Sequence, residues 1–249
     1  DAVKQGHRGD LRRRHQRLSH ELEIIPDEEW AARTAGLFDE RVRPGIRVCL
    51  PTGDTVRPFY HEVAKRSTLE GVEIFLLDEF GGLPADDPGR CEAMLNRDLV
   101  DRLRGSPTVR LPDVDASDPA LASRRYADLV GDGGIDLALV GLGGNGHIGM
   151  NEPGSRPDLP TRVVDLEPST IDHALHYGAT AAPTWGITLG LAELLDSREL
   201  WLLVTGKHKR EILARSLEGA IGPEVPASFL RGHPNLVVLA DESASVGLR

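Results

Sequence analysis

Residues 135–154, IDLALVGLGGNGHIGMNEPG, join an apolar run to a glycine-rich loop and decide the fold class. The run IDLALV is nearly continuous in apolar residues, which is typical of a central strand in a parallel sheet covered on both faces. The glycines that follow allow the backbone to approach a ligand closely and to adopt positive φ angles. The stretch therefore predicts a strand that leads directly into a binding or catalytic loop.

Further apolar runs alternate with helical segments along the chain. This alternation predicts an α/β fold, Rossmann-like and doubly wound, with a mostly parallel sheet in a single domain. Strands are expected at 46–50, 72–77, 135–140, 200–204 and 236–239, and helices at 26–42, 57–66, 90–103, 119–130, 192–195 and 209–217. Loops are expected at 81–89, 152–161 and 221–235.

Composition narrows the class of protein. The chain has 249 residues and a net charge of −10, which argues against binding to nucleic acid. No apolar stretch approaches the roughly 18 residues of a membrane span. Two cysteines, Cys49 and Cys91, are typical of a reducing, cytoplasmic location. We expect residues 1–22 to form a basic, poorly ordered tail and residues 23–249 to form the domain.

Four of the expected strands are followed at once by polar residues. Residues 51–55 follow the strand expected at 46–50, and Asp78 and Glu79 follow the strand expected at 72–77. The glycine-rich loop follows the strand expected at 135–140, and residues 205–209 follow the strand expected at 200–204. Ligands of open parallel sheets bind beyond the carboxyl ends of the strands, so we expect these four loops to converge.

His147 stands just past the glycines, and Glu152 lies five residues further on. An imidazole carries protons near neutral pH, and a carboxylate beside it fixes its tautomer. The alternative is a histidine that caps a helix with Glu152 solvated, and the density of glycines favours the chemical interpretation. Asp78 and Glu79 are either N-cap residues or include a base that removes a proton next to a carbonyl.

Two of the loops resemble anion sites. Residues 205–209 precede an expected helix and carry Lys209, which suits an anion as well as it suits a basic, solvated turn. Residues 52–55 offer similar donors, but the charge of Asp54 would repel an anion unless the side chain points away.

Residues 141–146, GLGGNG, match the bare pattern of dinucleotide-binding proteins. That fingerprint needs an acid at the end of a second strand about twenty residues on, and residues 162–166 offer no apolar strand with such an acid beyond Asp165. A nicotinamide cofactor is therefore a minor alternative.

Several motifs together point to one family. They are GHI at 146–148 with NEP at 151–153, DEF and GLP within 78–84, PTG at 51–53, a glycine–lysine turn at 206–209, and WGITLG at 185–190. In these motifs the chain resembles the glucosamine-6-phosphate deaminase/isomerase family, which is related to the 6-phosphogluconolactonases. The likeness runs from about residue 45 to residue 242. The NEPG continuation favours the deaminase/isomerase branch, because lactonases typically continue with a leucine-phenylalanine-proline-glycine run.

The resemblance implies roles for the matching residues. Asp78 would move a proton between C2 and C1 of the open-chain sugar, His147 would open the ring, and Glu152 would orient His147, with Asn145 beside them. It implies no cofactor and no metal, because the carbonyl or imine next to the abstracted proton accepts the electrons. The residues expected to bind the substrate and its phosphate are Thr52, Gly53, Asp54, Thr55, Gly143, Gly144, His176 and Lys209.

Four positions, in three places, depart from the family pattern. Asn145 stands where many relatives have an aspartate, Asp54 and Val56 replace a glycine and a proline of the phosphate loop, and His176 stands where relatives usually supply an arginine. The expected activity is the conversion of an amino sugar 6-phosphate to a ketose phosphate with release of ammonia. The alternatives are a sugar-phosphate lactonase and a non-catalytic sugar-phosphate sensor. The sugar stays open, as does the oligomeric state, with a homo-oligomer among the alternatives.

Overall fold

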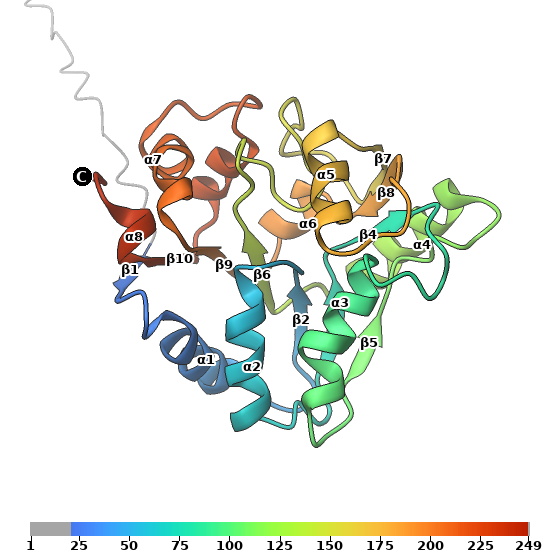
Figure 1. Cartoon of the computed structure of the whole chain (residues 1–249), viewed down its shortest axis with the longest axis horizontal. Helices are drawn as coiled ribbons and strands as arrows, with labels where there is room; N and C mark the ends of the chain where they lie inside the picture. Colours follow the sequence, from blue (N-terminus) through green and yellow to red (C-terminus); the bar gives the residue numbers. More distant parts are fainter. Residues whose placement is uncertain (1–20, 249) are drawn as a thin grey trace, which may run out of the picture.

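The computed structural model describes residues 21–248, and a seven-stranded sheet runs through its centre (Figure 1). Every pair of neighbouring strands in this sheet is parallel. In order across the sheet the strands are β1 (Glu21–Ile25), β10 (Leu236–Asp241), β9 (Glu199–Val204), β6 (Leu137–Gly141), β2 (Arg47–Leu50), β3 (Glu73–Leu76) and β5 (Thr108–Arg110). The predicted Rossmann-like, mostly parallel α/β domain is therefore confirmed.

Helices cover both faces of this sheet, as the near-continuous apolar strands predict. Along β2, Val48 and Leu50 point into one core and Cys49 into the other. The first core also contains residues of α1 (Trp30–Arg41), α2 (Val56–Arg66) and α3 (Cys91–Asp98). The second contains residues of α4 (Pro119–Gly131), α6 (Leu191–Leu195), α7 (Arg210–Glu218) and α8 (Glu242–Ser245).

A second, antiparallel sheet lies beside α5 and α6 (Figure 1). Its strands, in order, are β4 (Asp78–Gly81), β8 (Trp185–Thr188) and β7 (Arg162–Asp165), and α5 (Pro168–His176) follows β7. The strand pattern of the sequence does not predict this sheet, because its strands DEFG, RVVD and WGIT contain no apolar run comparable to those of the central strands. Residues 162–165 thus form a strand after all, but it lies outside the parallel sheet on which a dinucleotide site would depend.

The direction of strand order reverses between β2 and β6. From β2 the chain proceeds outward to β3 and β5, and then returns to place β6 on the other side of β2. Loops that leave two such strands separate, so a crevice opens between their carboxyl ends. Residues 51–55 and the glycine-rich loop flank this crevice.

The tail expected at residues 1–22 is too long at its C-terminal end. Residues 21 and 22 belong to β1, where Glu21 lies opposite Val237 and Leu22 opposite Val238. This edge strand is short and begins with alternating charged and apolar residues, so it gives no run comparable to the central strands. The rest of the expected tail, 1–20, lies outside the described residues.

Several element boundaries also differ from those expected. The expected helix 90–103 divides into α3 and a 3₁₀ turn (Val100–Arg102) because Leu99 leaves the helical region, with φ −131° and ψ −66°. The expected helix at 209 begins as α7 at Arg210, after a 3₁₀ turn (Lys207–Lys209). The expected loop 221–235 contains a 3₁₀ helix (Pro226–Gly232). Within residues 21–248, no helix is long and apolar enough to cross a membrane.

Candidate active site

A cavity of about 530 Å³ opens at the carboxyl ends of the central strands. All four loops that follow β2, β3, β6 and β9 contribute to its wall, as does α5. The expected site residues in the wall are Thr52, Gly53, Asp54, Thr55, Asp78, Gly143, His147, His176 and Lys209. The structure therefore brings nine of the twelve expected residues to one cavity.

Glu152 lies behind His147 rather than in the cavity wall. Its Oε2 is 3.2 Å from Nδ1 of His147 and accepts a hydrogen bond of 2.8 Å from Nδ2 of Asn145. Its Oε1 accepts a hydrogen bond of 2.5 Å from the hydroxyl of Thr170 in α5. The Oδ1 of Asn145 in turn accepts the backbone N–H of His147, at 3.0 Å. Bound through Nδ1, the imidazole presents Nε2 for proton transfer.

The amide of Asn145 explains how this chain works without an aspartate at that position. Because its amide nitrogen donates and its oxygen accepts, Asn145 bridges Glu152 and the backbone of His147. Burial acts to raise the pKa of Glu152, but the hydrogen bond and charge of His147, with the donors Thr170 and Asn145, lower it to about 2. Glu152 is therefore an anion throughout the neutral range.

Gly143 lies directly against the imidazole ring of His147. A Cβ at this position would lie 2.3 Å from Cδ2 and 2.4 Å from Nε2 of His147, so only a glycine allows the ring to rest there. The backbone N–H of Gly143 also donates to the carbonyl of His147 at 3.0 Å. The neighbouring Gly144 is different, because it is exposed and lies outside the cavity wall.

Asp78 is the first residue of β4 and is held opposite Thr188 of β8. Its side chain faces the cavity but is only 8% exposed as a residue. Burial raises the pKa of Asp78 to about 6, while a hydrogen bond from Cys91 and the charge of His147 act to lower it. A carboxyl group with such a pKa can both accept and return a proton near neutral pH.

The neighbouring carboxylate, Glu79, has a structural position instead. Its oxygens accept the backbone N–H groups of Phe80 (2.7 Å), Cys91 (2.9 Å) and Glu92 (2.7 Å). Two of these donors belong to the first turn of α3, so Glu79 satisfies amides that a helix N-terminus leaves free. Each of the two alternatives stated for Asp78 and Glu79 therefore applies to one of the residues. Glu79 caps a helix, and Asp78 faces the cavity.

The other end of the cavity is suited to an anion. Gly53 has a φ of +119°, and the Tyr177 hydroxyl would lie 3.1 Å from a Cβ built there, so the loop at 52–55 requires a glycine. Thr205 joins this loop to the one that carries Lys209 by a hydrogen bond of 3.3 Å to Thr55. The Lys209 ammonium forms no ion pair or hydrogen bond within residues 21–248, and burial lowers its pKa.

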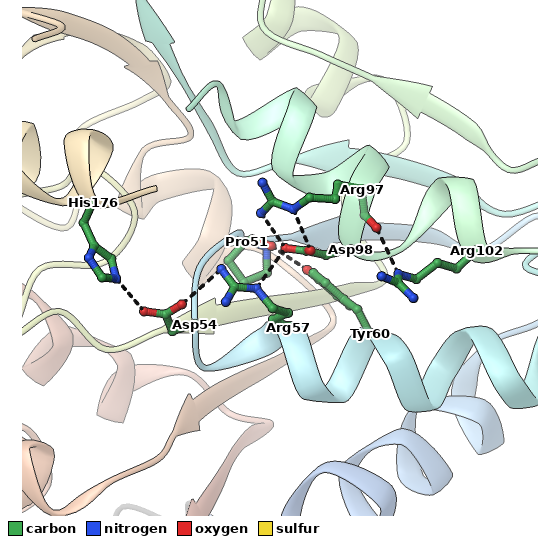
Figure 2. A network of polar contacts seen from close by, with 8 residues as sticks. All are labelled: Pro51, Asp54, Arg57, Tyr60, Arg97, Asp98, Arg102 and His176. Atoms are coloured by element: carbon green, nitrogen blue, oxygen red, sulfur yellow. Dashed lines mark hydrogen bonds and ion pairs between the residues drawn. The ribbon is translucent and has the colours of Figure 1, made fainter. Parts of the chain in front are cut away.

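Asp54 does not face this end as an isolated charge. Its carboxylate lies 3.1 Å from Nη2 of Arg57 and 3.5 Å from Nε2 of His176 (Figure 2). Arg57 also reaches Asp98, which is held by Arg97 through contacts of 2.9 and 3.0 Å. The repulsion of an anion by Asp54 is thus offset by Arg57, and His176 contacts Asp54 across the cavity mouth.

Four residues in or beside the cavity carry no sequence signal of their own. Thr170 and His173 come from α5, which follows the unpredicted strand β7, Tyr177 comes directly after α5, and Cys91 comes from the start of α3. Each reaches the cavity only because the second sheet and α3 pack against the carboxyl ends of the main sheet. A helical segment ending in two histidines and a tyrosine is the one hint that residues 170–177 present.

Together the fold and the cavity define a class: an α/β protein with one cavity at the carboxyl ends of parallel strands, lined by a buried aspartate, a histidine bound to a glutamate, and a lysine. Residues 27–238 match the family described as glucosamine-6-phosphate isomerases/6-phosphogluconolactonase, and the chain belongs to this family.

Curated relatives include glucosamine-6-phosphate deaminases. The one from Rhodopirellula baltica is 37% identical over 90% of this chain and 94% of its own, and the one from Beutenbergia cavernae is 35% identical over 92% and 93%. A solved structure described as a monomeric glucosamine-6-phosphate deaminase matches with a TM-score of 0.86 and 30% identity, over 92% of this chain and all of that one. A 6-phosphogluconolactonase from Trypanosoma cruzi, at 18% identity and a TM-score of 0.78 over 94% of this chain and 99% of its own, shares the fold.

Proposed function

We propose that this chain is a glucosamine-6-phosphate deaminase, which converts the amino sugar phosphate and water to fructose 6-phosphate and ammonia. The observation that carries the proposal is the pairing of Asp78 with the His147–Glu152 couple in one cavity that also contains an anion site. The deaminases among its relatives, 37% and 35% identical over nine tenths of the chain, support the same activity.

His147 opens the pyranose ring in this scheme. It moves a proton between the anomeric hydroxyl and the ring oxygen, and Glu152 stabilises the imidazolium that forms in between. Asn145 acts through Glu152 and the backbone, so we propose it as a positioning residue.

Asp78 then removes the proton from C2 of the open-chain sugar. The electrons move toward the C1 carbonyl, which gives an enol with the amino group still on C2. Asp78 returns the proton to C1, and the C2 imine that results adds water and releases ammonia. No external oxidant is consumed, because the sugar's own carbonyl accepts the electrons.

The phosphate is assigned to the backbone amides of residues 53–55 and to Lys209. Backbone amides at the start of α2 and an ammonium without another partner within residues 21–248 suit a dianion, with the amide of Asp54 shared with the hydroxyl of Tyr177. Thr52, Gly143 and His176 complete the wall around the substrate. Gly144 has no contact role in this proposal.

The test is a direct assay of the intact chain with glucosamine 6-phosphate and with galactosamine 6-phosphate, measuring both ammonia and ketose phosphate. Release of both products from glucosamine 6-phosphate supports the proposal. Hydrolysis of 6-phosphogluconolactone without ammonia release from either amino sugar would assign a lactonase instead. Saturable binding of the sugar phosphate without any turnover would assign a sensor.

A further inference from the structure

Helix α3 begins directly beside the proposed base. The Sγ of Cys91, the first residue of α3, lies 3.7 Å from Oδ1 of Asp78 and donates a hydrogen bond to it. Both residues are buried, with Cys91 2% and Asp78 8% exposed, so little water competes for this contact. A thiol is a weak donor in water, but burial strengthens its electrostatic effect on a carboxylate.

The position of this thiol is fixed from two sides. Glu79, the neighbour of Asp78 in β4, accepts the backbone N–H of Cys91 and of Glu92, which ties the first turn of α3 to the strand that carries the base. Burial and the charges of Glu79 and Asp78 raise the pKa of Cys91 well above its usual value, and on the other side a hydrogen bond with the Thr52 side chain acts to lower it. The thiol proton is thereby left for Asp78.

The two carboxylate oxygens of Asp78 consequently have different surroundings. Oδ1 is held by Cys91, whereas Oδ2 lies beside the backbone of Gly149, where a Cβ would be 3.1 Å away. The titratable groups around Asp78 are His147 of the loop after β6, Cys91 of α3, Cys49 of β2, Tyr60 of α2, Tyr126 of α4 and the adjacent Glu79, whose pKa burial raises to about 7. Of these, Cys91 is the group that donates a hydrogen bond to the Asp78 carboxylate within residues 21–248.

We propose that the Glu79-anchored start of α3 is a positioning element for the base, in which the Cys91 thiol holds Oδ1 of Asp78 and leaves Oδ2 to exchange the proton with substrate. Cys91 is a positioning residue and not a catalytic one, because it acts through Asp78. This inference rests on the proposed deaminase function, since it assigns Asp78 as the base.

The experiment compares the pH dependence of kcat/KM for the intact chain with that of Cys91→Ala and Cys91→Ser. Loss of the donor in Cys91→Ala is expected to move the acidic limb upward by about half a pH unit and to lower kcat roughly threefold to tenfold. The KM is expected to change little, because the phosphate contacts are untouched. Cys91→Ser retains a donor and is expected to restore most of the limb position and of kcat.

Cys49→Ala is the matched control. Cys49 is fully buried and close enough to Asp78 for its charge to be felt, but it packs into the opposite core and forms no hydrogen bond with Asp78 among the described residues. We expect the acidic limb of the kcat/KM pH profile of Cys49→Ala to coincide with that of the parent chain. An unchanged limb in Cys91→Ala, or an equal shift in Cys49→Ala, would overturn the inference.

A second measurement tests the contact between Cys91 and Asp78 without relying on enzyme turnover. The ¹³C carboxyl resonance of Asp78, assigned by its loss in Asp78→Asn, is titrated in the parent chain, Cys91→Ala and Cys91→Ser. An upward shift in Cys91→Ala that serine reverses supports the thiol contact even if no ammonia is released, in which case only the proposed function fails. Coincident titrations in all three chains contradict the inference, whatever the activity.

Discussion

The two ends of the cavity are built in different ways. At the proton-transfer end, the side chains of His147 and Glu152 are 15% and 11% exposed, and each contact is supported by another. At the anion end, the side chains of His176 and Asp54 are 67% and 56% exposed, and their contact is a single ion pair of 3.5 Å. A buried, cross-linked group has one geometry, whereas exposed charges adjust to their partners at small cost.

This difference shows where the chain tolerates change. The departures at Asp54 and His176 both fall at the exposed end, where an exposed ion pair contributes only about 0–1 kcal/mol. The departure at Asn145 falls at the buried end, and there the amide donates to Glu152 and accepts the backbone N–H of His147. We therefore expect the largest effects from substitutions at the proton-transfer end, and small ones where an exposed charge such as that of Asp54 is replaced at the anion end.

The largest loss of activity is expected for Asp78→Asn. Without a base, kcat should fall by about 10²- to 10⁴-fold, while KM changes little. Ammonia release by the purified variant, with its circular dichroism compared to that of the parent chain, is the measurement. Full activity in a folded Asp78→Asn would remove Asp78 from the mechanism.

The same substitution is expected to stabilise the fold at alkaline pH. The pKa of Asp78 is raised from 3.8 to about 6 by burial, so the folded chain binds a proton that the unfolded chain has released between these values. The carboxylate therefore costs stability once the pH exceeds the folded pKa, and costs nothing below the unfolded one. Asp78→Asn should raise the free energy of unfolding by roughly 1–3 kcal/mol at about pH 8 and by little near pH 4. Urea unfolding of the parent chain and of Asp78→Asn at both pH values tests whether the free energy of unfolding rises as expected.

Gly143→Ala is expected to displace the imidazole. The new methyl group would overlap the ring of His147, and a shift of about 1 Å at a reacting group costs on the order of 100-fold in rate. Gly144→Ala is the control, because nothing lies within 4 Å of a Cβ there and its φ is not in the left-handed region. Equal kcat values for the two variants would show that the support under His147 is unimportant.

Lys209→Ala tests the anion end. Loss of one charge-assisted hydrogen bond to a phosphate should raise KM by about 10- to 100-fold, with a smaller effect on kcat. The same variant should lose little affinity for unphosphorylated glucosamine, measured by inhibition. A fall in kcat with KM unchanged would instead place Lys209 at the reacting atoms.

The smallest effect is expected for Asp54→Asn. Removing an exposed charge that Arg57 already offsets should lower KM by only about twofold to fivefold. The effect should shrink as salt is added, because exposed charges are screened within about 10 Å at 0.1 M ionic strength. A change as large as that of Lys209→Ala would show that the ion pairs in Figure 2 do not offset the charge of Asp54.

Five of the seven strands of the main sheet could be predicted because their signal is local. An apolar run such as 135–140 indicates a two-sided strand wherever it occurs, and four such runs lead into polar loops at the same edge. The edge strands β1 and β5 and the strands of the second sheet contain no comparable run, so they could not be predicted in this way. They form where the folded chain provides partner strands for them.

The sequence by itself determined the parallel α/β fold and the presence of His147, Glu152 and Asp78 after successive strands, since these follow from periodicity and short motifs. Only the tertiary structure separated Asp78 from Glu79, because one faces the cavity and the other caps α3, a helix that begins thirteen residues after Asp78. It alone brought His176 of α5 to Asp54, whereas the ion pair of Asp54 with Arg57, three residues further on, is local. Charge compensation and pKa values depend on which distant segments pack together, and no local pattern records that.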